Sequence, residues 1–310
     1  PFDGKEDVKH MKNIKHILIC GAGMMGKNIG YVFASNPDFQ VGLYDLYPTD
    51  VEAGIRPHTK QLLDKGVITE QELSDRLSRI SFTTDMDSDL VKNADFVIEA
   101  VFEDMKIKRE TFAKLEARCR PDTIFCTNSS VMSPSEISAE LRHRERFVGT
   151  HFWNPGHLIP LVEVVKSDAS SDETAQTVIE VLSSAGKEPV LCKKDVPGFI
   201  ANRMQHALWR EAISIVENGI ADAATVDEAV RYSFGLRLPQ LGPMENADMV
   251  GTDLTYNIHD YILRDLEDSH EPSPLLKQIR DEGKIGFKTG EGFPKWTPVQ
   301  VAQCNAAPNA

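Results

Sequence analysis

The chain has 310 residues, which favours about two domains of ordinary size. Hydrophobic residues make up 41% and charged residues 26% of the sequence, and this composition excludes a disordered or fibrous chain. Because 34 Lys and Arg stand against 47 Asp and Glu, the net charge is −13 and a nucleic-acid backbone would be repelled. Nucleic acid is therefore not an expected partner.

No apolar run reaches the roughly 18–20 residues of a membrane span, and the polar N-terminus lacks the apolar centre of a signal peptide. The five cysteines are scattered and never form a CxxC pair, so neither a disulfide framework nor a metal site is predicted. We expect a cytoplasmic protein with no bound metal and no membrane association.

The first part of the chain alternates short β-branched runs with longer amphipathic segments, a pattern typical of β-α-β units around a parallel sheet. The predicted strands are residues 15–20, 39–45, 79–84, 94–101, 123–128, 146–152, 161–167 and 188–194. The helical segments between them include residues 25–35, 68–78, 108–119 and 172–186.

After the segment KKDVPGF the strand pattern stops and only helical patterns follow, at residues 201–219, 225–235, 246–266 and 273–283. The change falls near Asp195 to Pro197, where a proline after a strand favours a hinge. The sequence thus predicts an α/β domain over residues 1–195 and an all-α domain over residues 196–310. The tail from Thr297 has no apolar periodicity and is expected to be frayed.

A glycine-rich turn connects the first predicted strand to the first helix. The turn reads Gly21-Ala22-Gly23-Met24-Met25-Gly26, so the GxGxxG pattern lies in the strand-turn-helix context of a dinucleotide site, with Met25 as a further candidate cofactor residue. Gly21 permits the tight turn, Gly23 allows the backbone to approach a pyrophosphate, and Gly26 allows close helix packing. A glycine turn without a ligand is the alternative.

An acidic residue ends the second predicted strand. Asp45 follows Gly21 by 24 residues, a position from which a carboxylate accepts hydrogen bonds from the adenosine ribose. Residues 46–50 contain no cation that would meet the extra phosphate of NADP, so NAD is the expected cofactor. The alternative is that Asp45 is only a solvated turn residue.

The segment RFVGTHFWNPGHLIPLVEVV carries the candidate catalytic pair. His151 ends one predicted strand, Asn154 follows it, and Glu163 lies in the next strand, so imidazole and carboxylate can meet. Oxidation of an alcohol requires a base for the hydroxyl proton, and a carboxylate on the far imidazole nitrogen fixes the tautomer. Spacing alone also allows a structural histidine.

Residues 15–296 resemble the L-3-hydroxyacyl-CoA dehydrogenase superfamily. The similar motifs are GAGMMG, IEAVFEDMKIK, TNSS, HFWNP with LVEVV, KKDVPGFIANR, GPMENADMVGTD and KTGEGF, in the family's order and separations. The resemblance implies a Rossmann-type dinucleotide-binding N-terminal domain with an all-α C-terminal domain, and NAD-dependent interconversion of a hydroxyl and a carbonyl group.

The resemblance also implies roles for individual residues. His151 corresponds to the general base and Glu163 to the residue that orients it, while Ser130, Asn154 and Asn202 correspond to substrate-side residues. The residues implied along the nicotinamide half of the cofactor are Ala100, Glu103, Lys108 and Asn128. The structural alternatives are a helix cap for Ser130, a buried amide for Asn202, and surface charges for Glu103 and Lys108.

The substrate is expected to be a small free hydroxy acid rather than a CoA thioester. The segment after Asp45 is shorter and less basic than in the thioester enzymes, and the sequence resembles a branch that contains L-gulonate 3-dehydrogenase with lambda-crystallin, carnitine 3-dehydrogenase and 5-formyl-3-hydroxy-2-methylpyridine-4-carboxylate 5-dehydrogenase. Arg237, in the loop GLRLPQLGP, suits a substrate carboxylate, although it can instead pair with an acidic neighbour. A 3-hydroxyacyl-CoA dehydrogenase and a non-catalytic lens-type NAD-binding protein are the alternatives.

The resemblance further implies a homodimer formed through the helical half. Apolar residues recur there at helical spacing, which fits either a dimer interface or an internal core; they are Met204, Leu208, Ala212 and Ile215.

Overall fold

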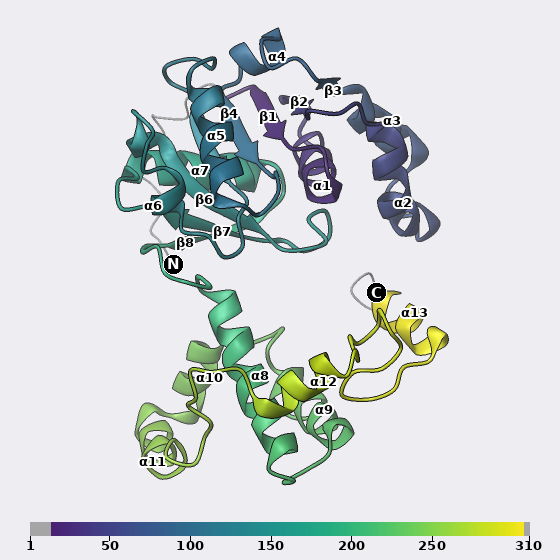
Figure 1. Cartoon of the computed structure of the whole chain (residues 1–310), viewed down its shortest axis with the longest axis vertical. Coiled ribbons are helices and arrows are strands. Elements are labelled where there is room, and N and C mark those ends of the chain that lie inside the picture. The colour runs from purple at the N-terminus through teal and green to yellow at the C-terminus, as the bar shows by residue number, and fades with distance from the viewer. Residues whose placement is uncertain (1–13, 307–310) are drawn as a thin grey trace. The chain divides into compact units, whose positions relative to one another are not determined.

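A computed structural model describes residues 14–306 of the chain, and the side chains up to Cys304. The chain divides into two compact units, the first ending at Ile200 and the second beginning at Ala201 (Figure 1). Among the helices of residues 14–306, none combines the length and the apolar composition that a membrane span requires.

The first unit is built around an eight-stranded sheet with the order β3-β2-β1-β4-β5-β6-β7-β8. All neighbouring strands run parallel except β6 and β7, which pair antiparallel. The strands are β1 (His16–Cys20), β2 (Gln40–Tyr44), β3 (Ile80–Thr83), β4 (Phe96–Glu99), β5 (Ile124–Thr127), β6 (Phe147–Phe152), β7 (Leu161–Lys166) and β8 (Glu188–Cys192). Each lies within a predicted strand, and the order of the first six is that of a Rossmann fold.

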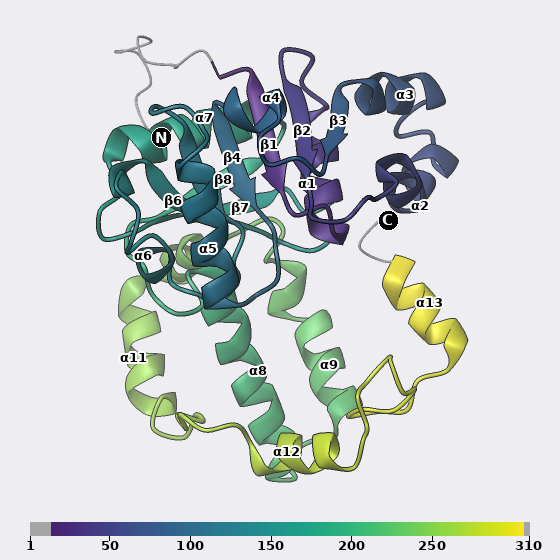
Figure 2. The ribbon, with the colours of Figure 1, turned by 45° about the horizontal axis from the view of Figure 1, so that its top comes forward.

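Helices cover both faces of this sheet, as Figures 1 and 2 show from two directions. They are α1 (Met24–Phe33), α2 (Val51–Asp64), α3 (Glu70–Ser78), α4 (Asp89–Lys92), α5 (Met105–Glu116), α6 (Pro134–Ile137) and α7 (Asp172–Ser184). One core cluster joins α1 and α7 to one face of the sheet, and another joins α4, α5 and α6 to the opposite face. Helix α2 was not among the predicted helices.

The alternation of side chains along the strands explains the two layers. In β1, Ile17 and Ile19 belong to the cluster with α1, whereas Leu18 and Cys20 belong to the cluster with α5. Successive side chains of a strand point to opposite faces, and a strand buried on both faces is therefore apolar throughout. The strand order reverses between β1 and β4, and the carboxyl ends at such a switch point form the usual ligand crevice of an open α/β sheet.

The second unit is helical, with α8 (Ala201–Glu217), α9 (Ala223–Arg231), α10 (Pro243–Val250), α11 (Thr252–Ile262), α12 (Pro274–Asp281) and α13 (Pro298–Ala306). Two predictions were wrong here. The single helix predicted over residues 246–266 is broken at Gly251, whose φ of 103° lies outside the helical region. The tail predicted to be frayed contains α13, which begins at Pro298, a residue suited to the first turn of a helix.

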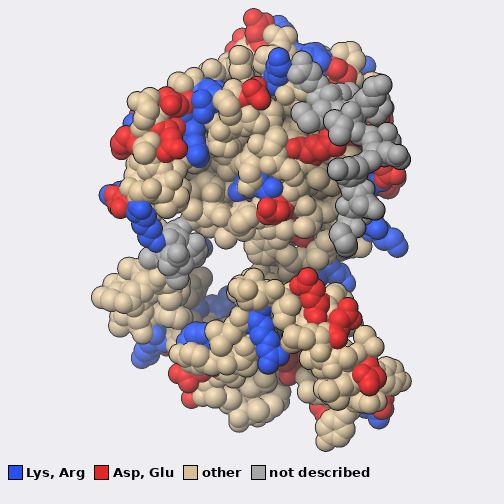
Figure 3. Space-filling model, turned by 180° about the vertical axis from the view of Figure 1, so that it is seen from behind, with Lys and Arg blue, Asp and Glu red and all other residues tan. Residues whose placement is uncertain are grey.

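Burial differs sharply between the two units. The first unit contains every buried residue of the described chain, whereas no residue between 201 and 304 is buried. Large apolar side chains of the helical unit, such as Met204, Leu208 and Trp209, are exposed, and broad uncharged areas lie over this unit in Figure 3. On the face shown there, Lys and Arg are interspersed with Asp and Glu.

Candidate active site

The glycine turn between β1 and α1 brings three backbone segments close together. Gly21 has a φ of 106°, and a Cβ there would lie 2.6 Å from the carbonyl oxygen of Ala100. A Cβ at Gly26 would lie only 1.8 Å from the carbonyl oxygen of Gly21, so α1 packs directly on the turn. At Gly23, by contrast, a Cβ would meet no atom within 4 Å. The open space at Gly23, at the N-terminus of α1, fits the approach of a pyrophosphate to the backbone.

Asp45 follows β2 beside this turn. Its Oδ2 accepts a hydrogen bond of 2.7 Å from the backbone N–H of Ala22, and its Oδ1 accepts one of 3.2 Å from Tyr47. Each oxygen keeps a further lone pair for a ribose hydroxyl. Sequence reasoning missed a nearby cation: Nζ of Lys27 donates to Oγ1 of Thr49 at 2.7 Å, and Thr49 belongs to the segment that follows Asp45. Lys27 belongs to α1, so it lies outside residues 46–50, where the cation that meets the extra phosphate of NADP was expected.

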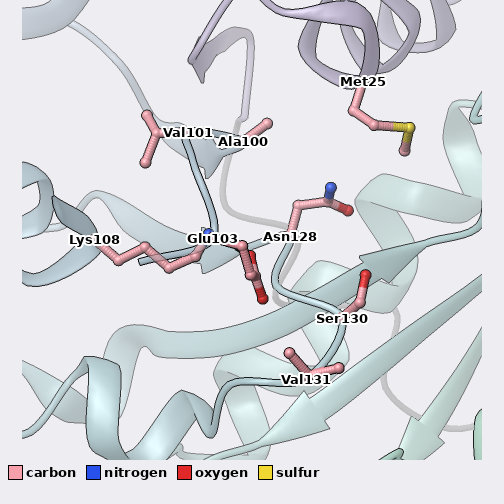
Figure 4. A pocket seen from close by; sticks show the side chains of 8 residues that line it. All are labelled: Met25, Ala100, Val101, Glu103, Lys108, Asn128, Ser130 and Val131. Atoms are coloured by element: carbon pink, nitrogen blue, oxygen red, sulfur yellow. The ribbon is translucent and has the colours of Figure 1, made fainter. Parts of the chain in front are cut away.

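A cavity of about 430 Å³ lies at the carboxyl ends of β4 and β5. In Figure 4, Met25 comes from α1, Ala100 and Val101 from the segment after β4, and Asn128 and Ser130 from the segment after β5. The lining residues are Met25, Ala100, Val101, Glu103, Lys108, Asn128, Ser130 and Val131. The fold thus brings together six of the predicted cofactor or substrate residues, and sequence reasoning missed the two valines.

His151 and Glu163 face each other across the antiparallel pair of β6 and β7. The register places them directly opposite, and Nδ1 of His151 lies 2.8 Å from Oε2 of Glu163. Glu163 is 0% and His151 is 4% exposed. A carboxylate in its ionised form only accepts hydrogen bonds, so a neutral imidazole paired with it at Nδ1 would present its Nε2 lone pair. Within residues 14–306, no protein group makes a hydrogen bond to Nε2.

The PGF turn closes over this pair. The backbone N–H of Ile200 donates to Oε1 of Glu163 at 2.9 Å, and the ring of Phe199 lies 5.6 Å from the ring of His151. Phe199 adopts a positive φ of 49°, an uncommon conformation for a residue with a side chain. On the other side, Nε1 of Trp153 lies 3.4 Å from Oε2 of Glu163. A buried carboxylate with these donors is held in one orientation.

The pair and the cavity are connected through Asn128. Its side-chain Oδ1 accepts a hydrogen bond of 3.0 Å from the backbone N–H of Phe152, the residue after His151. Asn128 also lines the cavity. The base candidate and the cavity wall are therefore parts of one hydrogen-bonded structure within the first unit.

The remaining predicted residues lie apart from this cluster or in the other unit. Asn154 is exposed in the loop after β6 and is not among the residues that line the cavity. Asn202 is half-buried on α8, and Arg237 is exposed at the end of a short 3-10 turn, both in the second unit. Among the described residues of the second unit, no carboxylate lies within 4 Å of the Arg237 guanidinium.

Sequence reasoning did not single out three residues around the pair. Trp153 and Ile200 donate to the carboxylate of Glu163, and Phe199 packs against the ring of His151. The motif HFWNP contains the first and KKDVPGF runs into the other two, so a signal was present. A glycine before an aromatic residue, after a proline, indicates a tight turn. What that turn contacts depends on tertiary packing.

A Rossmann-type sheet with a glycine cradle at its switch point, beside a buried His–Glu pair, defines the class: an NAD-dependent dehydrogenase that acts on a CH–OH group. Comparison with known proteins specifies the family. Residues 16–196 match the model of the 3-hydroxyacyl-CoA dehydrogenase NAD binding domain, and residues 198–296 match that of the 3-hydroxyacyl-CoA dehydrogenase C-terminal domain. The chain belongs to the 3-hydroxyacyl-CoA dehydrogenase family, and its cofactor is NAD.

Similar proteins include enzymes for two kinds of substrate. The chain is 37% identical to a probable 3-hydroxybutyryl-CoA dehydrogenase of Bacillus subtilis, covering 90% of this chain and 96% of the relative. It is 32% identical to the 5-formyl-3-hydroxy-2-methylpyridine 4-carboxylate 5-dehydrogenase of Mesorhizobium japonicum, covering 94% of each.

Solved structures show the same division. A structure of a 5-formyl-3-hydroxy-2-methylpyridine 4-carboxylic acid 5-dehydrogenase, described as an NAD+ dependent dismutase, has a TM-score of 0.84 at 32% identity, with 95% and 94% covered. The (S)-3-hydroxybutyryl-CoA dehydrogenase of Ralstonia eutropha has a TM-score of 0.76 at 28% identity, covering 92% of this chain and 99% of that chain.

Proposed function

We propose that the chain interconverts the hydroxyl and carbonyl groups of a small free hydroxy acid, with His151 as the general base. The observation that carries the catalytic part is the 2.8 Å contact between Nδ1 of His151 and Oε2 of Glu163, buried within the sheet. When bound, NAD supplies the acceptor of the hydride. The reaction also needs a group that takes the hydroxyl proton, and Nε2 of His151 is suited to do so.

Glu163 acts on the substrate only through His151. Its carboxylate fixes the tautomer in which Nε2 is free to accept, and it stabilises the imidazolium after the proton arrives. Because Ile200 and Trp153 donate to the same carboxylate, the imidazole needs little reorganisation during the reaction. A base positioned in this way contributes about 10²- to 10⁴-fold to a reaction rate.

Ser130 and Asn202 are proposed to hold the substrate oxygen. A hydroxyl and a side-chain amide both donate hydrogen bonds and neither changes its charge, so they orient the oxygen without competing for its proton. We assign cofactor binding and the base to residues 1–195, and part of the substrate contacts to residues 196–310. Asn154, exposed in the loop after β6, is also proposed to contact the substrate.

Arg237 supports a free acid as the substrate. Its guanidinium is exposed and has no carboxylate within 4 Å among the described residues of the helical unit, so the alternative of an acidic neighbour finds no support within that unit. A guanidinium binds a carboxylate through two parallel hydrogen bonds, which an ammonium cannot do. The TM-score of 0.84 to an enzyme of a pyridine carboxylic acid points in the same direction.

A hydroxyacyl-CoA thioester is the second candidate. The observation that favours it is the 37% identity to the probable 3-hydroxybutyryl-CoA dehydrogenase of Bacillus subtilis. A thioester lacks the carboxylate that Arg237 would bind, so the two candidates make different predictions for this residue.

The experiment compares NADH formation from a panel of free hydroxy acids with that from 3-hydroxybutyryl-CoA. For a free acid, Arg237→Ala should remove about 2–4 kcal/mol of transition-state binding, or about thirty- to a thousandfold in kcat/KM. Arg237→Lys should restore part of it. A better turnover of the thioester, or an unchanged kcat/KM of Arg237→Ala on the best acid, would exclude the free-acid assignment.

We also propose that the chain is a homodimer formed through the helical unit. Helix α8 carries Met204 and Leu208 at helical spacing, and both side chains are more than one-third exposed. Since no residue from 201 to 304 is buried, a second copy would supply the apolar surface that these helices lack. Light scattering should give twice the 34.5 kDa mass of one chain, and a single 34.5 kDa species at micromolar concentration would reject the dimer.

A further inference from the structure

Three charged side chains form a group in and behind the wall of the cavity. Nζ of Lys108 lies 2.8 Å from Oε1 of Glu99 and 3.1 Å from Oε2 of Glu103. Glu99 and Lys108 are buried, with 0% and 1% of their side chains exposed, whereas Glu103 is 39% exposed. Glu103 and Lys108 line the cavity (Figure 4). Glu99, at the end of β4, contacts Lys108 and is not among the lining residues. We refer to these residues as the charged triad.

The hydrogen bonds of Glu99 indicate that it is ionised. Oε1 accepts from the backbone N–H of Val101 at 2.7 Å and from Lys108, and Oε2 accepts from Oγ1 of Thr127 at 2.7 Å. Burial raises the pKa of Glu99, while Lys108 and the hydroxyl of Thr127 oppose that change. The Val101 N–H and the Lys108 ammonium can only donate, and the Thr127 hydroxyl donates in this geometry, an arrangement that suits a carboxylate.

Glu103 is also ionised. Partial burial raises its pKa, but the hydrogen bond from Ser129 and the charge of Lys108 outweigh burial and leave the pKa below its ordinary value. Two carboxylates against one ammonium give the charged triad a net charge of −1. Lys108 alone would be neutralised by Glu99, so Glu103 supplies the excess charge at the cavity surface.

We propose that the charged triad makes the site bind NAD+ in preference to NADH. The oxidised nicotinamide ring carries a positive charge and the reduced ring is neutral, so a net negative wall stabilises only the oxidised form. This inference rests on the proposed function, because it takes the cavity as the place of the nicotinamide ring. Glu99 is a positioning residue in this proposal, since it acts through Lys108 and through its charge.

The test measures the dissociation constants of NAD+ and NADH by calorimetry for Glu99→Gln and Glu103→Gln. Each change removes one negative charge and leaves the triad neutral. The dissociation constant of NAD+ should rise about five- to twentyfold while that of NADH changes less than about twofold, since one unit charge near a cationic ring alters affinity by about an order of magnitude. The half-exposed Glu103 also provides a test if Glu99→Gln does not fold.

Thr127→Val is the matched control. It removes one hydrogen bond to Glu99 and keeps all three ionisable side chains of the triad, so it should affect NAD+ and NADH by the same factor. Equal losses for both cofactor forms in Glu103→Gln would overturn the proposal and give the triad a structural role. Turnover of hydroxy acids by the wild type is measured separately. If the wild type turns over hydroxy acids while Glu103→Gln weakens both cofactor forms equally, the dehydrogenase assignment stands and only the proposed charge effect is wrong.

Discussion

The two units of the chain bury their side chains in opposite ways. The first unit encloses charged groups such as Glu99, Lys108 and Glu163, and every one of these has a hydrogen-bonding partner within the same unit. The second unit buries no residue from 201 to 304 and exposes large apolar side chains. Buried charges require a rigid and complete surrounding structure, whereas exposed apolar faces require a further surface. The comparison shows that the first unit completes its own core, and the exposed apolar faces of the helical unit are the basis of the dimer proposed above.

The largest expected effect tests whether the glycine turn is part of that closed core. Gly26→Ala would place a Cβ 1.8 Å from the carbonyl oxygen of Gly21, so the helix and the turn must separate. We expect a loss of about 3 kcal/mol or more in the free energy of unfolding, measured by urea denaturation.

Gly23→Ala is the control for that substitution. A Cβ there meets no atom within 4 Å and the φ of −67° suits alanine, so stability should change by less than about 1 kcal/mol. Affinity for NAD should nevertheless fall about tenfold or more, because the methyl group takes space that the pyrophosphate needs. Equal destabilisation by both changes would contradict the assignment of separate roles to the two glycines.

A second substitution tests the open surface of the helical unit. Leu208→Lys puts a charge on the exposed apolar face of α8 and should convert the dimer to a monomer at micromolar concentration, as measured by sedimentation velocity. Val67→Lys, which replaces an exposed apolar residue of the first unit, should leave the dimer intact. If both variants remained dimeric, α8 would not belong to the interface.

The third prediction concerns cofactor choice within the first unit. Asp45→Ala removes the carboxylate that holds the Ala22 N–H and is placed for the ribose, so NAD should bind about tenfold more weakly. The affinity for NADP should fall less, because its 2′-phosphate no longer meets a like charge. The preference for NAD over NADP should therefore become smaller. Adding Lys27→Met should weaken NADP more than NAD if the ammonium beside Thr49 contributes. Calorimetry that gives the wild type equal affinity for NAD and NADP would contradict this account of Asp45.

The smallest expected effect is a pH dependence of stability. Burial lowers the pKa of His157, and His58 and Lys187 add to the decrease, although a hydrogen bond to the carbonyl of His58 opposes it. As pH falls below about 6.5, His157 is protonated in the unfolded chain before it is protonated in the folded one, so the folded state loses stability. His157→Gln should lose about 1–2 °C less in Tm between pH 7.5 and 5.5 than the wild type. An equal or larger loss in the variant would remove His157 from the acid response.

Much of the first unit was predictable because its strands are buried on both faces. A short apolar run such as HILIC in β1 is best explained as a buried strand when such runs alternate with amphipathic helices. All eight predicted strands contain a strand of the structure. The His151–Glu163 contact was predictable because a short connection joins the two strands that carry these residues. The antiparallel register of β6 and β7 places the two residues directly opposite each other.

What could not be predicted depends on contacts between distant segments or on weak local patterns. Helix α2 contains Pro57 and few buried residues, so its periodicity is faint. The break at Gly251 needs a positive φ that a glycine permits but does not require. Ile200 reaches Glu163, and Lys27 reaches Thr49, across separations of 37 and 22 residues. No local rule of spacing specifies such pairs.

The most direct test of the account is the turnover of His151→Gln on the best substrate, measured together with its affinity for NAD. In the proposed mechanism, the glycine turn and Asp45 hold the cofactor, and His151 contributes only to the chemical step. We therefore predict that kcat falls by about 10²- to 10⁴-fold while the dissociation constant of NAD changes less than about twofold. A variant that retains most of its turnover would contradict the assignment of His151 as the base.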